Sequence, residues 1–255
     1  MENNIEKVRH SLAHIMAEAV TELYPKTKLG MGPAIENGFY YDFELPKNFQ
    51  PEDLKKIEDK MKKLIFQDQK FTKKYIAKLA ANNLFSAEGG SASGGNYQPY
   101  KLELLKELPG KTVSIFTNGN FTDLCKGPHI KQTKEINPNA FRLTRIAGAY
   151  WKGSEKNKML TRIYGVAFET EKELQNFIKM QEEAEKRDHI KLGKYLKIFT
   201  FSDLVGPGLP LWLPNGAVII EELEKLAKET ERRAGYLQVR TPHIAKEIMY
   251  KTSGH

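Results

Sequence analysis

Residues 140–168 read AFRLTRIAGAYWKGSEKNKMLTRIYGVAF, and this stretch decides the fold of the first half of the chain. Two runs rich in aromatic and β-branched residues, AFRLTRIAGAYW and LTRIYGVAF, lie on either side of a polar turn that contains Gly153 and Asn157. Such runs around such a turn are typical of two strands that follow each other in a sheet. We therefore predict two strands here, within a mixed α+β domain whose sheet is mostly antiparallel.

The segments before this stretch predict further helices and strands. Residues 5–24 carry apolar side chains at three- and four-residue spacing, which predicts an amphipathic helix. A second helix is expected to begin at QPEDL, because Pro51 suits the first helical turn. We predict strands at FYYDFEL, YKLELL and VSIFTN, and a loop at FTDLCKGPHI. AEGGSASGGN, residues 87–96, is predicted to be a flexible insert.

After residue 168 the pattern changes from sheet to helix. Thr170 and Glu173 have the spacing of a capping box, which predicts the start of a charged helix over 171–194. AVIIEELEKLAKETERRAGY predicts an amphipathic helix that ends at Gly235, and LQVRTPHI has strand character. The chain is therefore divided into a first domain over 1–170, a linker helix over 171–194 and the start of a second domain over 195–255.

The overall composition limits the class of protein. With 255 residues and 40% hydrophobic content the chain is long enough for two cores, and no apolar run approaches the ~18 residues of a membrane-spanning helix. MENNIEKVRH lacks the pattern of a signal peptide, and the single cysteine, Cys125, excludes an intramolecular disulfide, so we expect a soluble cytoplasmic protein. The net charge of +8 is as compatible with a nucleic-acid partner as with a lysine-rich surface.

His10 and His14 lie four residues apart in the first predicted helix. Successive helical residues rotate by roughly 100°, which places both histidines opposite the apolar stripe of Leu12, Ile15 and Met16. This disfavours a histidine of the hydrophobic core. It leaves two interpretations, a solvated helix surface and the wall of a cleft.

Cys125 and His129 repeat the same spacing within TDLCKGPHI. Gly127 and Pro128 exclude an ordinary helix between them, and a loop that carries Cys and His in this way resembles half of a metal site. Together with the two histidines of the helix, the set would contain three nitrogens and one sulfur, which suits zinc. The alternative is a buried structural thiol beside an unrelated loop histidine.

Five segments together resemble the threonyl-tRNA synthetases of bacteria. They are HSLAHIMAEAV, GPAIENGFYYDFEL, FTDLCKGPHI, RIAGAYWKGSEKNKMLTRIYGVAF and EEAEKRDHIKLGKYL. The block over 147–168 is the most specific, whereas the HxxxH and CxxxH pairs alone indicate only the threonyl/alanyl editing superfamily. The resemblance implies that 1–170 is the editing, or second additional, domain. It implies that 195–255 begins a class II catalytic domain, with its motif 1 in the helix over 217–234 and the strand that ends at Pro242.

The resemblance also implies an activity. The complete enzymes join threonine to tRNA(Thr) with ATP, and rejecting serine by its missing methyl group yields only ~1–3 kcal/mol. This chain is therefore expected to carry mainly the hydrolysis of mischarged seryl-tRNA(Thr) at the tRNA acceptor end. The ligase sites for ATP, Mg and Zn are expected beyond residue 255, and the complete enzyme is expected to be a homodimer through motif 1. Two alternatives stay open, a stand-alone trans-editing deacylase and a non-catalytic tRNA-binding module.

The same resemblance assigns roles to individual residues. His10 and His14 are expected to line the ester site and order the water, and Lys101 to supply positive charge. The pocket wall that recognises the seryl amine and hydroxyl is expected to contain Tyr41, Asp123, Cys125 and His129. Lys126 stands where arginine is commoner and keeps a cation near the RNA. Because the threonyl branch is understood to edit without a metal, no metal is expected; zinc, if bound, would be held by His10, His14, Cys125 and His129.

Overall fold

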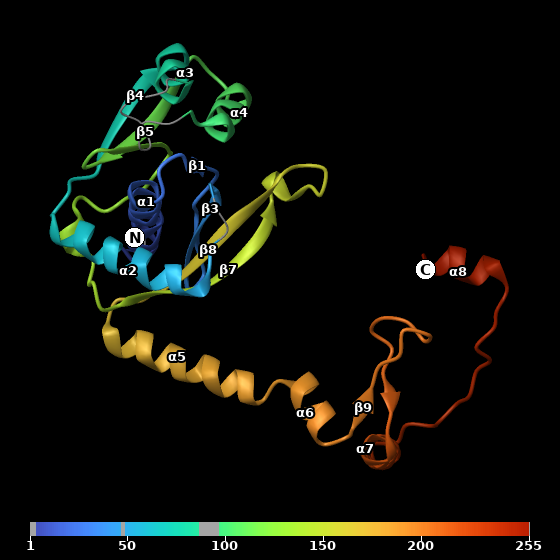
Figure 1. Cartoon of the computed structure of the whole chain (residues 1–255). Coiled ribbons are helices and arrows are strands. Elements are labelled where there is room, and N and C mark those ends of the chain that lie inside the picture. Colours follow the sequence, from blue (N-terminus) through green and yellow to red (C-terminus); the bar gives the residue numbers. More distant parts are fainter. Residues whose placement is uncertain (1–3, 47–48, 87–96, 255) are drawn as a thin grey trace. The chain divides into compact units, whose positions relative to one another are not determined.

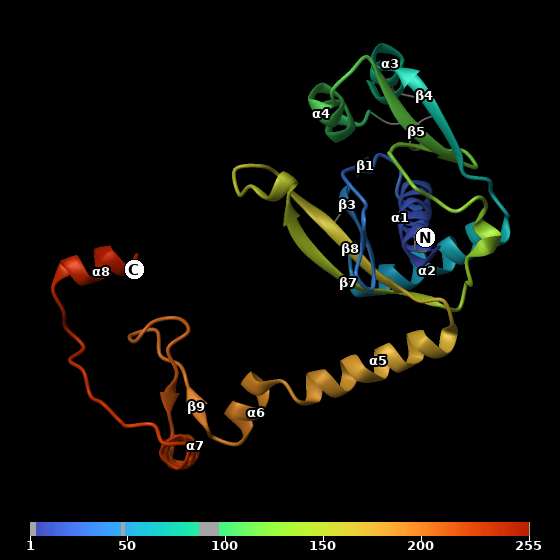
Figure 2. The ribbon, with the colours of Figure 1, turned by 180° about the vertical axis from the view of Figure 1, so that it is seen from behind.

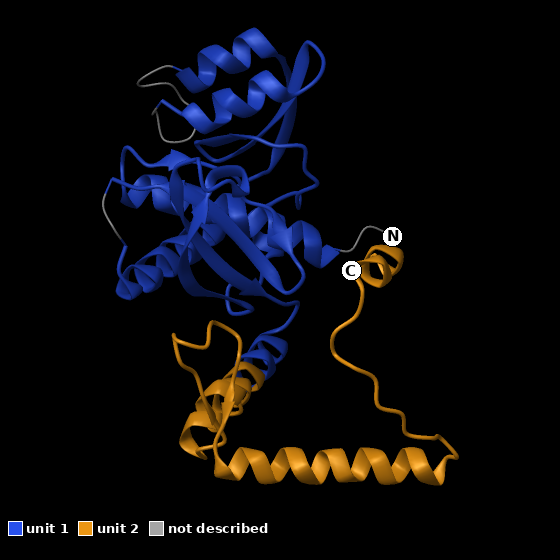
Figure 3. Ribbon diagram, turned by 90° about the vertical axis from the view of Figure 1, so that its right-hand side faces the viewer, with its two compact units in different colours: residues 1–179 blue, residues 180–255 orange. Residues whose placement is uncertain are grey.

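The computed structural model describes residues 4–46, 49–86 and 97–254 (Figure 1 and, from behind, Figure 2). The chain divides into two compact units, Met1–Lys179 and Met180–His255 (Figure 3). The flexible insert predicted over 87–96 lies outside the described residues. Within the described ranges, no helix is both long and apolar enough to span a membrane.

The main sheet of the first unit is antiparallel and is built around the two strands predicted from 140–168. Its strands are β1 (Lys28–Leu29), β2 (Ala34–Ile35), β3 (Gly38–Glu44), β7 (Phe141–Tyr150) and β8 (Met159–Ala167). The strand order is β1-β3-β8-β7, and β2 pairs with β3. Tyr150 pairs with Met159 at the end of the β7–β8 hairpin, where Gly153 has a φ of 71° in the turn. The predicted antiparallel α+β fold is confirmed.

Two helices, α1 (Asn4–Leu23) and α2 (Pro51–Phe66), cover one face of this sheet (Figure 1). Apolar side chains of α1 pack on Phe39, Tyr41 and Phe43 of β3, which are fully buried. From Val8 to Thr21, every residue of α1 except His10 is buried. The face that carries the histidines is therefore covered as well, and it is not a solvated surface.

A smaller sheet of three strands forms the other part of the first unit. It contains β4 (Thr72–Ala77), β5 (Thr112–Asn118) and β6 (Phe121–Leu124) in the order β4-β5-β6, with α3 (Lys78–Ser86) and α4 (Pro99–Glu107) beside it. The sequence did not predict β4 or α3. The first part of FTDLCKGPHI is strand β6, whereas a loop was predicted for the whole segment.

The strand predicted at YKLELL is wrong, because this segment lies in helix α4. Pro99 occupies the start of the helix, where its missing N–H costs nothing. Tyr100, Lys101 and Leu105 are buried, which is helical spacing, whereas a half-buried strand would bury every second residue. Lys101 lies on the buried face of α4.

The predicted linker helix over 171–194 is two helices in the structure, α5 (Glu171–Lys186) and α6 (His189–Tyr195). The capping box at the start of α5 is confirmed: Glu173 N donates to Thr170 Oγ1 at 3.2 Å, and Glu173 Oε2 accepts from Thr170 N at 3.2 Å. Asp188 begins the second helix, because its Oδ1 accepts from Lys191 N at 2.8 Å.

The second unit continues with β9 (Phe199–Thr200), β10 (Leu211–Trp212), α7 (Pro214–Arg233) and α8 (Glu247–Ser253). The helix predicted to end at Gly235 corresponds to α7. The strand predicted at LQVRTPHI is wrong, since residues 237–244 have no regular structure. Leu237 and Val239 are 91% and 79% exposed, and no strand described in the chain pairs with this segment, so its backbone gains no ladder hydrogen bonds.

Candidate functional site

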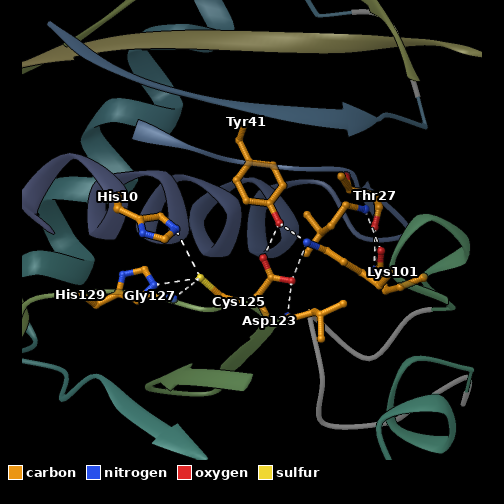
Figure 4. Close-up of polar contacts among 11 residues, drawn as sticks. His10, Thr27, Tyr41, Lys101, Asp123, Cys125, Gly127 and His129 are labelled. Carbon is orange, nitrogen blue, oxygen red and sulfur yellow. Dashed lines mark hydrogen bonds and ion pairs between the residues drawn. The ribbon is translucent and has the colours of Figure 1, made fainter. Parts of the chain in front are cut away.

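Four side chains with metal-ligand chemistry meet where α1 faces the loop after β6. We call them the donor cluster: His10, His14, Cys125 and His129. One nitrogen or sulfur atom from each lies within 4.8 Å of all the others. Cys125 Sγ is 3.3 Å from His10 Nε2 and 3.3 Å from His129 Nε2 (Figure 4). The fold thus brings together the two pairs that the sequence places roughly 115 residues apart.

The loop conformation allows His129 to turn back onto the cysteine. Gly127 has a φ of 75°, a conformation that favours glycine, and a Cβ at this position would lie 2.7 Å from Phe116 Cζ. Its N–H donates to Cys125 Sγ at 3.3 Å. Phe71 stacks on the His129 ring with 5.0 Å between the ring centres, so the imidazole is held by packing as well.

Outer hydrogen bonds orient the imidazoles. His10 Nδ1 lies 3.1 Å from Pro128 O, a carbonyl that only accepts, so Nδ1 carries the proton and the lone pair of Nε2 faces Cys125. Ser11 Oγ lies 3.0 Å from His129 Nδ1 and accepts from Ile130 N at 3.2 Å. His14 Nδ1 is buried and has no hydrogen-bond partner among the described residues. Ser11 was not predicted, and its position beside His10 was the only signal.

Burial keeps the donor cluster uncharged. It lowers the pKa of His10, and it lowers the pKa values of His14 and His129 further, where neighbouring histidines add to the effect. Burial also raises the pKa of the Cys125 thiol to about 11. Near neutral pH the cluster therefore contains neutral imidazoles and a protonated thiol, and His10, whose pKa is lowered least, stays the strongest base of the three imidazoles.

The donor cluster fits a zinc ion. Three nitrogens and one sulfur are a common tetrahedral set, and second hydrogen bonds such as those of His10 and His129 are typical of histidine ligands. His14 also has a ring nitrogen, Nδ1, that makes no hydrogen bond among the described residues. Binding would require Cys125 to lose its proton. The expected absence of a metal stays a prediction.

A second group, the buried polar triad, consists of Tyr41, Lys101 and Asp123. Lys101 Nζ lies 2.6 Å from Asp123 Oδ1 and donates to Tyr41 Oη at 2.9 Å, while Tyr41 Oη donates to Asp123 Oδ2 at 2.5 Å (Figure 4). Tyr41 lies on β3, Lys101 on α4 and Asp123 on β6, so separate parts of the unit meet here. Burial and the Asp123 charge raise the pKa of Tyr41 well above its usual value, which keeps its hydroxyl proton in place.

A pocket of about 580 Å³ opens beside both groups. Six of the eight predicted site residues line it: His10, His14, Lys101, Asp123, Cys125 and Lys126. Tyr41 and His129 are not among the lining residues, and they support Asp123 and Cys125 through the contacts above. The remaining wall is largely apolar and was not predicted; it includes Met31, Tyr75, Leu104, Leu108, Val113 and Leu124.

Comparison with known proteins shows what this part of the chain is similar to. The family model of the threonyl and alanyl tRNA synthetase second additional domain matches residues 113–164, which include Asp123, Cys125 and His129. A threonine–tRNA ligase of Gloeobacter violaceus is 49% identical over 252 residues, 98% of this chain and 39% of the relative. The chain is related to the threonine–tRNA ligases.

Other relatives agree. A threonine–tRNA ligase of Dehalococcoides mccartyi is 49% identical over 253 residues, 99% of this chain and 41% of the relative. One of Borrelia hermsii is 46% identical over 255 residues, 100% of this chain and 42% of the relative. The chain thus spans about two fifths of the length of these ligases. The resemblance stated from the sequence motifs is confirmed.

Proposed function

We propose that residues 1–170 are an editing domain that hydrolyses the ester of seryl-tRNA(Thr). One observation carries this proposal: neutral histidines of α1 and the charged Lys101–Asp123 pair line the same pocket. Ester hydrolysis needs a positioned water, a proton acceptor and positive charge beside the developing oxyanion. The pocket offers a candidate for each. Similarity to threonine–tRNA ligases over nearly the whole chain supports this class of substrate.

In this mechanism a water molecule attacks the ester carbonyl carbon, and a neutral imidazole takes its proton. His10 is the first candidate for the acceptor, because it lines the pocket and its Nε2 carries the lone pair, which faces the Cys125 thiol at 3.3 Å. Lys101 offsets the charge that develops on the carbonyl oxygen, and Asp123 and Tyr41 hold its ammonium group in place. The ester then cleaves, and the ribose oxygen of the terminal adenosine receives the proton.

The pocket wall is proposed to select serine over threonine. Among the residues that the structure describes, Asp123 is the one carboxylate lining the pocket, and it is placed to accept from the seryl amine. Cys125 and His129 would complete the wall around the seryl hydroxyl, and Lys126, which is exposed at the rim, would face the RNA. A zinc ion held by the donor cluster would supply Lewis-acid activation of water. We propose that editing proceeds without it.

The complete protein is proposed to be a cytoplasmic threonine–tRNA ligase that uses ATP, Mg and Zn at sites outside this chain and acts on the acceptor end of tRNA(Thr). The linker helix is proposed over 171–194 and the start of the class II catalytic domain over 195–255. Helix α7, with Val218, Leu223 and Leu226 each at least 60% exposed, suits the dimer interface of motif 1. A stand-alone deacylase and a non-catalytic tRNA-binding module remain the alternatives.

Single-turnover deacylation of seryl-tRNA(Thr) by the purified chain tests the proposal. His10→Ala is expected to lower the rate constant at least ~100-fold, the range of a lost general base. His243→Ala is the matched control, because His243 is an exposed histidine of the other unit, and it is expected to behave like the wild type. Binding of tRNA without hydrolysis by the wild type would instead support the non-catalytic module.

A further inference from the structure

Two tyrosines and two arginines lie against one another on the sheet face that α1 and α2 do not cover, with the Arg162 guanidinium beside the Tyr40 ring and the Arg145 guanidinium beside the Tyr164 ring. We call this group the Tyr–Arg column: Tyr40 on β3, Arg162 and Tyr164 on β8, and Arg145 on β7. The guanidinium carbon of Arg162 lies 3.8 Å from the Tyr40 ring centre, and that of Arg145 lies 4.2 Å from the Tyr164 ring centre. The two rings are 5.7 Å apart.

Strand register places these residues on one face. Phe39, Tyr41 and Phe43 point into the core under α1, so Tyr40 and Asp42 point to the opposite face. Tyr40 pairs with Tyr164, which in turn pairs with Arg145, and Asp42 pairs with Arg162. The column therefore crosses three neighbouring strands. Arg145 at its end is exposed.

The two arginines have different surroundings. Arg162 Nε and Nη2 donate to the two carboxylate oxygens of Asp42 at 2.6 and 2.9 Å, so its charge is matched and its plane is fixed against Tyr40. Arg145 has no carboxylate within ion-pair distance among the described residues. Its guanidinium face rests on Tyr164, which leaves the N–H edge available. A stacked guanidinium with a free edge suits bidentate binding of a phosphate.

The column begins at the pocket. Tyr40 lines the pocket as well as forming the first member of the column, and the column runs from there to Arg145. From the Tyr40 ring centre through the Tyr164 ring centre to the Arg145 guanidinium the path is at most about 10 Å, a span of no more than roughly three stacked nucleotides at ~3.4 Å each. Arg142, also exposed and on β7, adds a second cation near its far end.

We propose that the Tyr–Arg column guides the RNA strand whose 3′ end enters the pocket, and that Arg145 binds one of its phosphates. The inference rests on the proposed function, because it takes the occupant of the pocket to be the end of an RNA. Tyrosine faces and guanidinium planes stack on bases of any sequence, so the column serves the unpaired end of the strand. Asp42 is a positioning residue that keeps Arg162 in the stack.

Two measurements test the column, made on Arg145→Gln and on Lys55→Gln. The control removes the same charge from an exposed position on α2, which covers the other face of the sheet. The first measurement is the dissociation constant of uncharged tRNA(Thr) transcript between 50 and 200 mM salt. The second is hydrolysis of 3′-O-seryl-adenosine, which fills the pocket but has no upstream phosphate.

Arg145→Gln is expected to weaken tRNA binding about 3- to 10-fold, to reduce the salt slope by about 0.7–1, and to hydrolyse the small ester like the wild type. Equal affinity and slope in the two variants would overturn the inference. So would equal losses on tRNA and on the small ester, because that result indicates a structural role. If the wild type hydrolyses neither seryl ester but the slope still changes, the proposed function fails and the RNA path stands.

Discussion

Replacing Glu18 with glutamine is expected to remove a pH dependence from the stability of the first unit. Glu18 lies on α1, one turn after His14, and only 3% of its surface is exposed. Its Oε1 accepts from Gln69 Nε2 at 3.0 Å and its Oε2 accepts from Asn118 Nδ2 at 2.7 Å. Burial outweighs these hydrogen bonds and raises the pKa of the carboxyl from 4.5 to about 7.

The direction of this pH dependence follows from which state, folded or unfolded, binds the Glu18 proton more tightly. The folded state binds the Glu18 proton more tightly than the unfolded state, so this carboxyl stabilises the fold fully below pH 4.5. The contribution is lost as the pH rises through about 7. The rise of the carboxyl pKa from 4.5 to about 7 corresponds to about 3 kcal/mol in the free energy of unfolding. Glutamine does not titrate, and Asn118 Oδ1, which is buried without a partner among the described residues, can accept from its amide if the Asn118 side chain flips.

Urea unfolding followed by circular dichroism at pH 4.5, 5.5, 6.5 and 8 measures this effect. The difference in unfolding free energy between Glu18→Gln and wild type is expected to shift toward the variant by about 3 kcal/mol between pH 4.5 and 8. Glu6→Gln, at an exposed position on the same helix, is the control and should follow the wild type. Parallel curves for Glu18→Gln and wild type across this range would refute the argument.

Three further experiments test other parts of the structure. Lys101→Met is expected to cost about 3–5 kcal/mol in urea unfolding, because it leaves the buried Asp123 unpaired; a loss below about 1 kcal/mol would contradict the buried ion pair. Gly165→Ala places a Cβ 2.5 Å from Phe39 Cζ and is expected to cost about 1–3 kcal/mol, whereas Gly148→Ala meets only the flexible Met159 side chain and should cost less. Metal analysis of well-washed protein is expected to find far less than one zinc per chain; stoichiometric zinc, removed by chelators together with activity, would contradict metal-free editing.

Local patterns predicted the parts of the fold that depend on neighbouring residues. The β7–β8 hairpin, the α2 helix and the capping box at Thr170 each follow from signals within a few residues. The strand prediction for YKLELL failed because this short apolar run fits the periodicity of a helix as well as that of a strand. Packing against the smaller sheet favours the helix. The strand prediction for LQVRTPHI failed because strand propensity does not form a strand without a second strand to pair with.

The candidate site shows the same division. Spacing alone identified the histidine pair and the Cys125–His129 pair, but it could not show that they meet, since that depends on how α1 packs against the loop after β6. Lys101 came only from the family resemblance. The Tyr–Arg column was not predicted, because its residues come from three strands and align only through the register of the sheet.

The selectivity of ester hydrolysis tests the central claim most directly. Single-turnover rate constants would be compared for seryl-tRNA(Thr) and threonyl-tRNA(Thr) at saturating concentrations of the chain. An editing pocket is expected to release serine at least about 10-fold faster, because the additional methyl group of threonine has to be accommodated by the pocket wall. Equal rates for the two esters, or persistence of both, would contradict an editing site in this chain.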